Sequence, residues 1–144
     1  MPSSDLTPAR VRFARVLLVV TLGYMLLLVW ATHHPKPELL LGPNAPSDKT
    51  LHFIAYGVLA TLVTGTLAVA RSRKLLRSAM LPAGLATFAA VDEITQPFFS
   101  RHADPIDWVY DCMGIALGLL AVAVAVAAVR WMRGRQAQLG VGGR

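Results

Sequence analysis

Four long apolar runs, separated by short polar segments, dominate the chain. They predict helices at about residues 16–31, 48–70, 78–96 and 105–129. With a rise of about 1.5 Å per residue, each helix is long enough to span roughly 30 Å of hydrocarbon. The sequence therefore predicts an all-α fold, an integral membrane bundle of four transmembrane helices. The four helices form a single transmembrane domain, which ends in a basic cytoplasmic tail at 130–144.

Two of the predicted helices have clear start signals. Ser47 is a good N-cap, and Asp48 follows it in the first turn, where the positive end of the helix dipole favours a carboxylate. Asp104, Pro105 and Asp107 form a similar start, with an N-cap, a proline at the first helical position and an acid in the first turn. These signals place the polar starts of two helices beside predicted loops.

The two loops that precede these helices differ in composition. The segment 32–47 is rich in proline and predicts an extramembrane loop with an interfacial turn at 39–41. Pro97 ends the third predicted helix, and a short polar segment leads from it to Asp104. Neither loop is long enough for a second domain.

Composition and charge support a membrane protein. The chain has 144 residues, of which 55% are hydrophobic and 15% charged, so it is too apolar for an ordinary soluble domain. Its net charge of +6 arises from basic clusters beside the apolar runs, which makes a nucleic-acid partner unnecessary. The basic clusters precede the first helix, follow the second and fill the tail, so the positive-inside rule predicts that both termini are cytoplasmic.

Acidic residues gather where the pattern predicts membrane. Five of the eight carboxylates lie between residues 90 and 114, next to apolar runs on both sides. Carboxylates near hydrocarbon are costly unless they face the bundle interior, have partners or belong to a functional site. This segment is therefore the centre of the predicted site.

Polar side chains share one face on each of three predicted helices, at about 100° per residue. They are Lys49, His52 and Tyr56 on the second helix, Asp92, Glu93 and Gln96 on the third, and Asp104, Asp107 and Asp111 on the fourth. Helical rise puts the three sets at a similar depth near the outer surface. The sequence thus predicts an outward-facing polar cleft.

The same residues carry a resemblance to a known family. The order Asp48-Lys49-x-x-His52-Phe53-x-x-Tyr56, Asp92-Glu93-x-x-Gln96 and Arg101-x-x-Asp104-x-x-Asp107-x-x-x-Asp111-x-x-Gly114 resembles the VanZ-like family of small bacterial membrane proteins. The resemblance extends over about half the chain, up to Gly118. It implies a multi-pass protein of the bacterial cytoplasmic (inner) membrane with a role in the cell envelope, since the family is named for a protein associated with teicoplanin resistance.

The leading hypothesis is a binding or accessory role in which the cleft recognises membrane lipids, a lipid-linked envelope precursor or a glycopeptide. Lys49 and Arg101 would bind a phosphate, and Tyr56 and Gln96 would supply neutral hydrogen bonds. The remaining binding candidates are Asp48, Asp104, Asp107 and Asp111.

The alternative is an intramembrane hydrolase or transferase acting on a lipid-linked substrate. His52 would be the base, Asp92 or Glu93 would orient it or hold a metal ion, and Arg101 would stabilise charge. One histidine among several carboxylates suits a hard divalent ion better than structural zinc, and no cofactor is assigned. A proton-coupled transporter is a third hypothesis.

A purely structural interpretation of the same residues stays open. Asp92, Glu93 and Arg101 would then form an ion-paired brace that holds the last two helices together. His33, in the proline-rich loop, is expected to be solvated at the surface.

Overall fold

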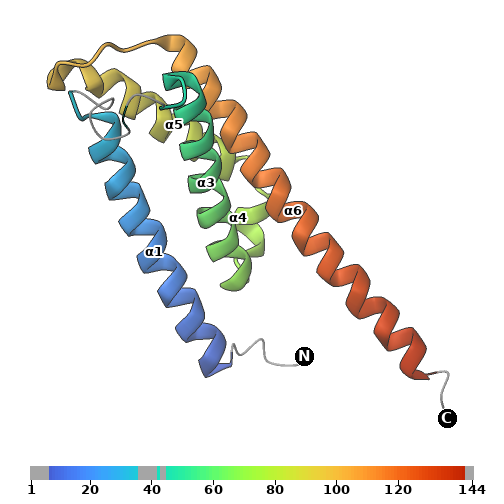
Figure 1. The fold of residues 1–144 in the computed structure, drawn as a ribbon. Helices are drawn as coiled ribbons and strands as arrows, with labels where there is room; N and C mark the ends of the chain where they lie inside the picture. The colour runs from blue at the N-terminus through green and yellow to red at the C-terminus, as the bar shows by residue number, and fades with distance from the viewer. Residues whose placement is uncertain (1–6, 36–41, 43–44, 142–144) are drawn as a thin grey trace.

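A computed structural model describes residues 7–35, 42 and 45–141, and the regular secondary structure of this part of the chain is all helical, without strands. The interfacial turn predicted at 39–41 lies outside the described residues. The helices of Figure 1 are α1 (Pro8–Thr32), α3 (Asp48–Val69), α4 (Arg73–Arg77), α5 (Met80–Thr95), the 3-10 turn η1 (Gln96–Phe99) and α6 (Pro105–Val141).

Three helices are long and apolar enough to cross a membrane: α1, α3 and the part of α6 from Pro105 to Gln138. Large apolar side chains on their outer faces are exposed, for example Leu26 at 74% and Leu120 at 59%. Such extensive apolar exposure is unusual in a soluble monomer and typical of a lipid-facing surface. The fold is therefore that of an all-helical membrane protein with three candidate spans.

The fourth predicted span is not confirmed as a membrane crossing, because the helix in the range 78–96 is short. α5 lies within that range and has only 16 residues, and an extended backbone at Ser78 (φ −88°, ψ 149°) separates it from α4. At about 1.5 Å per residue α5 rises roughly 24 Å, less than the hydrocarbon thickness. Pro82 lies in the first turn of α5, where a missing N–H costs nothing, and it fits poorly inside a longer helix.

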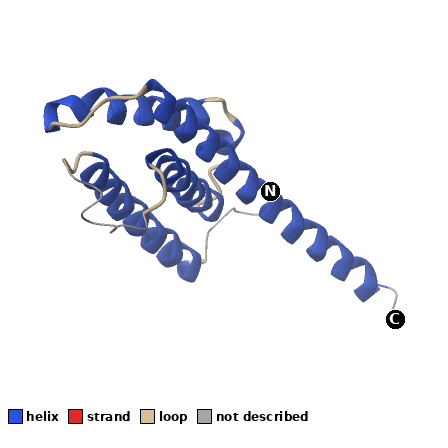
Figure 2. Cartoon of the chain, turned by 45° about the horizontal axis from the view of Figure 1, so that its top comes forward, coloured by secondary structure: helices blue, strands red, loops and turns tan. Residues whose placement is uncertain are grey.

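Two other helices are longer than the sequence predicted. α1 begins at Pro8, a favourable first helical residue, so the basic residues before the first apolar run are helical. α6 continues past 129 to Val141. Its C-terminal part extends beyond the other helices (Figures 1 and 2).

α3 is the central helix of the bundle. It packs most extensively against α6 and next against α1, while α5 packs against α6. Gly57 faces Gly114 at the contact of α3 with α6, and a Cβ atom on Gly114 would overlap the carbonyl oxygen of Phe53. The two backbones therefore touch, as small residues allow in membrane bundles.

The bundle has two chemically different ends. Arg10 Nε donates a hydrogen bond to the carbonyl oxygen of Val69 at 2.7 Å, which joins the start of α1 to the end of α3. The start of α1 and the end of α6 both lie toward this end in Figure 1. The opposite end contains the C-termini of α1 and α5 and the starts of α3 and α6, so the predicted site residues come together there.

Candidate functional site

The outer layer of the site consists of ion pairs. Lys49 Nζ, on the first turn of α3, lies 3.0 Å from Asp104 Oδ2 and 3.2 Å from Asp107 Oδ1 at the start of α6. Arg101 Nη2 lies 3.4 Å from Asp48 Oδ2. These contacts join the loop before α6 to the start of α3.

The N-caps predicted for the two helices are confirmed. Ser47 Oγ accepts a hydrogen bond from the backbone N–H of Thr50, and Asp104 Oδ1 accepts one from the N–H of Ile106 at 2.9 Å. The Ile106 N–H and the neighbouring Lys49 ammonium lower the pKa of Asp104 from its ordinary value, because both favour the ionised carboxylate. The Asp104 cap thus also keeps an ionised carboxylate at the outer edge of the site.

A histidine and a carboxylate form the buried centre of the site. His52 Nδ1 on α3 lies 3.0 Å from Asp111 Oδ1 on α6. Their side chains are 3% and 1% exposed, so the pair is shielded from solvent by the protein itself. The partner of His52 is therefore Asp111, rather than the Asp92 or Glu93 predicted to orient it.

Glu93 brings α5 to this centre. Its Oε1 accepts a hydrogen bond from the backbone N–H of Asp104 at 2.6 Å, and its Oε2 accepts one from Gln96 Nε2 at 2.8 Å. One ligand atom from each of Glu93, His52 and Asp111 lies within 4.8 Å of the other two. Three helices that are distant in sequence thus converge on one buried cluster.

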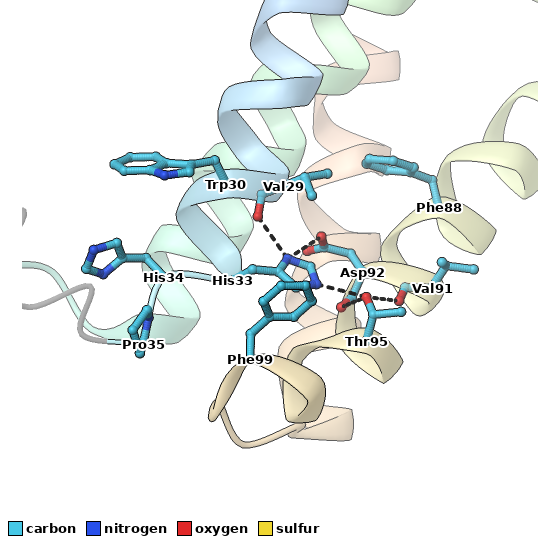
Figure 3. A pocket seen from close by; sticks show the side chains of 10 residues that line it. All are labelled: Val29, Trp30, His33, His34, Pro35, Phe88, Val91, Asp92, Thr95 and Phe99. Carbon is cyan, nitrogen blue, oxygen red and sulfur yellow. Dashed lines mark hydrogen bonds and ion pairs between the residues drawn. The ribbon is translucent and has the colours of Figure 1, made fainter.

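Asp92 lies in a second polar environment at the end of α1 (Figure 3). Thr32 Oγ1 donates a hydrogen bond to Asp92 Oδ1 at 3.0 Å, and His33 Nδ1 lies 3.6 Å from the same oxygen. His33 Nε2 lies 2.9 Å from Thr95 Oγ1. The prediction that His33 is solvated at the surface was wrong, since its side chain is 10% exposed.

The contribution of α1 was missed by sequence reasoning. Thr32 and His33 directly follow the first apolar run, at the outer level where Asp92 was expected to need a partner. The shared depth of these residues in the predicted membrane was the signal that could have revealed the contact with Asp92. Both residues were instead assigned to the proline-rich loop, because the first predicted helix was expected to end at residue 31. α1 ends at Thr32, and His33 is its C-cap.

Several polar atoms in the site are buried and lack a hydrogen-bond partner among the described residues. They are Tyr56 Oη, Asp92 Oδ2, Asp111 Oδ2 and Arg101 Nε. Tyr56 is fully buried, and its hydroxyl interacts electrostatically with Asp92, Asp111 and Glu93. Buried polar atoms are normally satisfied, so these atoms indicate room for a ligand, an ion or water.

Arg101 does not belong to the buried cluster. Within the described part of the chain its ion pair is with Asp48, and it forms none with Asp92 or Glu93. The predicted brace between Arg101 and these two acids is therefore absent from the described residues. Lys49 and Arg101 are also both engaged by carboxylates, so neither is a free cation for a phosphate.

A pocket of about 530 Å³ opens between α1 and α5 (Figure 3). Its walls are mainly apolar, and Asp92 is the predicted site residue that lines it, with His33 and Thr95 beside it. The lining residues are Val29, Trp30, His33, His34, Pro35, Phe88, Val91, Asp92, Thr95 and Phe99. The pocket is thus beside the polar cluster rather than between its three helices, where the cleft was predicted.

Comparison with family models, curated proteins and solved structures finds no match for the chain. The resemblance to the VanZ-like family therefore stays a prediction.

Proposed function

We propose that the protein is a VanZ-like accessory protein of the bacterial cytoplasmic membrane that binds an amphiphilic molecule of the cell envelope at the outer surface. The ligand class comprises a membrane lipid, a lipid-linked precursor or a glycopeptide with an apolar tail. The observation that carries the proposal is the pocket between α1 and α5, which combines apolar walls with one buried polar edge.

The pocket fits an amphiphile in size and chemistry. About 530 Å³ lies within the range of roughly 300–1,000 Å³ typical of small-molecule sites. Phe88, Val91 and Phe99 offer an apolar surface for a hydrocarbon chain. Asp92 supplies an acidic acceptor at the edge of the pocket, so the ligand's polar part should carry a donor such as a hydroxyl, amide or amine.

We further propose a four-span topology in which α5 is a short fourth crossing and both termini are cytoplasmic. Between α3 and α6 the chain returns from the end that contains Val69 to the end that contains Pro105, through α4 and α5 (Figure 1). The segments with basic clusters gather at the first of these ends, in agreement with the positive-inside rule. Local thinning of the bilayer and snorkelling of flanking side chains accommodate a short span at modest cost.

Mass spectrometry of molecules that co-purify with the protein in native nanodiscs tests amphiphile binding. Wild type should retain a defined envelope amphiphile. Val91→Trp, which fills the pocket, should lose it, and Asp92→Asn should weaken retention about tenfold by removing the charged acceptor. Val58→Trp is the matched control because Val58 is an exposed apolar residue of α3 that does not line the pocket. Identical co-purified profiles for all four proteins would refute the proposal.

The His52–Asp111 pair favours a second candidate, an intramembrane hydrolase or transferase. A buried imidazole oriented by a carboxylate is a common arrangement for a general base. His52→Gln should then cause an unprocessed amphiphile to accumulate on the protein. An accessory binder would instead retain the same molecule in wild type and in His52→Gln, so one measurement separates the two candidates.

A further inference from the structure

We propose that His52, Glu93 and Asp111 together bind a divalent metal ion. One imidazole nitrogen and two carboxylate oxygens, each from a different helix, lie within 4.8 Å of one another, and all three residues are buried. Ligands about 2.0–2.2 Å from a metal are separated by roughly 3–4 Å, so a small closing movement brings the three atoms to that arrangement.

Three buried carboxyl groups of the site have no Lys or Arg partner among the described residues. Asp92, Glu93 and Asp111 are all buried. Within the described residues, the Lys49 and Arg101 ion pairs involve the outer carboxylates and none of these three. Asp92 has a neighbour of its own, since His33 Nδ1 lies 3.6 Å from its Oδ1.

Glu93 and Asp111 then remain as two buried carboxyl groups beside the single imidazole of His52. Buried charges are unfavourable unless they are paired or coordinate a metal ion. A single divalent ion would neutralise both carboxylates, and it would use the imidazole in the neutral form that metals bind.

A second observation points to a ligand at the same place. Asp111 Oδ2 has no hydrogen-bond partner within the described chain, although the Asp111 side chain is only 1% exposed. The buried hydroxyl of Tyr56 interacts electrostatically with Asp92 first and also with Asp111 and Glu93. Asp111 Oδ2 is therefore the atom available to ligate the ion.

A second candidate group lies on the outer side of His52. Asp48, His52 and Asp107 also place ligand atoms within 4.8 Å of one another, and Asp48 is exposed. Arg101 pairs with Asp48 and Lys49 with Asp107, so this outer group is already neutralised. The inner group has no Lys or Arg partner in the described residues and is therefore the favoured binding site.

The ligand set suits Mn²⁺ or Zn²⁺. Imidazole favours transition metals, whereas an all-oxygen environment favours Mg²⁺ and Ca²⁺. The inference concerns the inner cluster and does not depend on amphiphile binding in the neighbouring pocket.

Metal loading of the full-length protein in nanodiscs tests the proposal. The protein is stripped with EDTA, incubated with Mn²⁺ or Zn²⁺ and desalted, and bound metal is measured by inductively coupled plasma mass spectrometry. Mn²⁺ electron paramagnetic resonance provides a second readout. Wild type should retain about one ion per chain, whereas His52→Gln and Glu93→Gln should lose affinity at least about tenfold.

The controls separate the two groups and the two proposals. Asp48→Asn removes a carboxylate of the outer group alone and should keep wild-type metal content, as should the pocket variant Val91→Trp. Circular dichroism checks that each variant is folded, and Asp111→Asn, nearly isosteric, provides a second inner variant. The proposal is overturned if folded wild type retains neither ion, or if Asp48→Asn loses as much metal as Glu93→Gln.

Discussion

A single ammonium group joins α3 to the start of α6. Lys49 Nζ contacts both Asp104 and Asp107, and the side chain of Asp107 is only 6% exposed. The lysine therefore neutralises one solvated and one buried carboxylate. Ion pairs at a surface usually contribute little, but a buried carboxylate that loses its partner is costly.

Replacing Lys49 should change the titration of Asp104. The pKa of Asp104 is lowered by the Ile106 N–H and by Lys49, so Lys49→Met should raise it part of the way toward its ordinary value near about 3.9. A carbon-13 NMR titration of labelled aspartate carboxyls measures this change. Because the folded pKa is lowered, the stabilisation by Asp104 is present above the unfolded pKa and is lost as the pH falls through the folded value. The control is Lys74→Met, which removes an exposed positive charge on α4 and should leave the titration of Asp104 unchanged.

Thr32 should contribute measurably to stability through Asp92. Thr32→Val keeps the side-chain shape but removes the hydrogen bond to Asp92 Oδ1, so the free energy of unfolding should fall by about 1–3 kcal/mol. Reversible unfolding in mixed detergent measures the difference. Thr61→Val is the matched control, since Thr61 bonds only locally to the carbonyl oxygen of Gly57. Equal losses for both variants would contradict a special role for the Thr32 contact.

Prediction of single residues succeeded where the sequence signal lies within one helical turn. Ser47 and Asp104 cap helices because side chain, spacing and dipole lie within one turn. His52 and Asp111 were expected in one site, but their pairing depends on the rotation of α3 and α6 about their axes, which periodicity gives only to within a wide arc. The contact of His33 with Asp92 was missed because it depends on where α1 ends and how it packs against α5.

At the scale of whole elements, the contact between α3 and α6 fixes the geometry of the site. Gly57 and Gly114 face each other, and Gly118 approaches the carbonyl oxygen of Gly57. His52 and Asp111 lie within about one turn of this contact, so their separation is set by backbones that touch.

A methyl group at the contact should therefore push the helices apart. Gly114→Ala places a Cβ against the Phe53 carbonyl oxygen and should reduce the free energy of unfolding by about 1–3 kcal/mol. Gly134→Ala in the same helix has open space around it and should be neutral or stabilising by up to about 1 kcal/mol. Thermal unfolding of both variants is the measurement. A stable Gly114→Ala protein with an unchanged His52 environment would show that the contact is looser than described.

The elements themselves were only partly predictable. Apolar runs located α1, α3 and α6, because membrane helices are long and hydrophobic. The helix predicted at 78–96 agrees closely with α5, whereas α4 was missed because its five residues lie in a basic cluster that was interpreted as a loop. The continuation of α6 past 129 was missed because the basic residues after the apolar run were interpreted as a tail outside the helix. Basic side chains do not end a helix.

At the scale of the whole molecule, the arrangement of the bundle constrains its insertion in the membrane. The candidate site gathers at one end, and the start of α1 and the ends of α3 and α6 lie toward the other (Figure 1). Because α3 and α6 both start at the end that contains the site, both can cross the bilayer only if the segment between them, α4 and α5, also crosses it. A crossing by α5 therefore keeps the start of α1 and the end of α6 on one side of the membrane, opposite the site.

Cysteine labelling in intact cells should reveal four crossings. After Cys112→Ala, single cysteines are introduced as Ser72→Cys, His102→Cys and Gln136→Cys. A membrane-impermeant maleimide should label the cysteine at 102 in intact cells, and those at 72 and 136 only after permeabilisation. Equal labelling of positions 72 and 102 in intact cells would show that α5 does not cross.

The length of α6 has a mechanical consequence. A helix of 37 residues is about 55 Å long, well beyond the roughly 30 Å of hydrocarbon that it has to cross. A stiff rod of that length amplifies small rotations: pivoting by about 10° around its polar end would sweep the opposite tip through roughly 10 Å. Binding of a ligand at one face of the membrane would thus displace the positively charged C-terminal part of α6 at the other face.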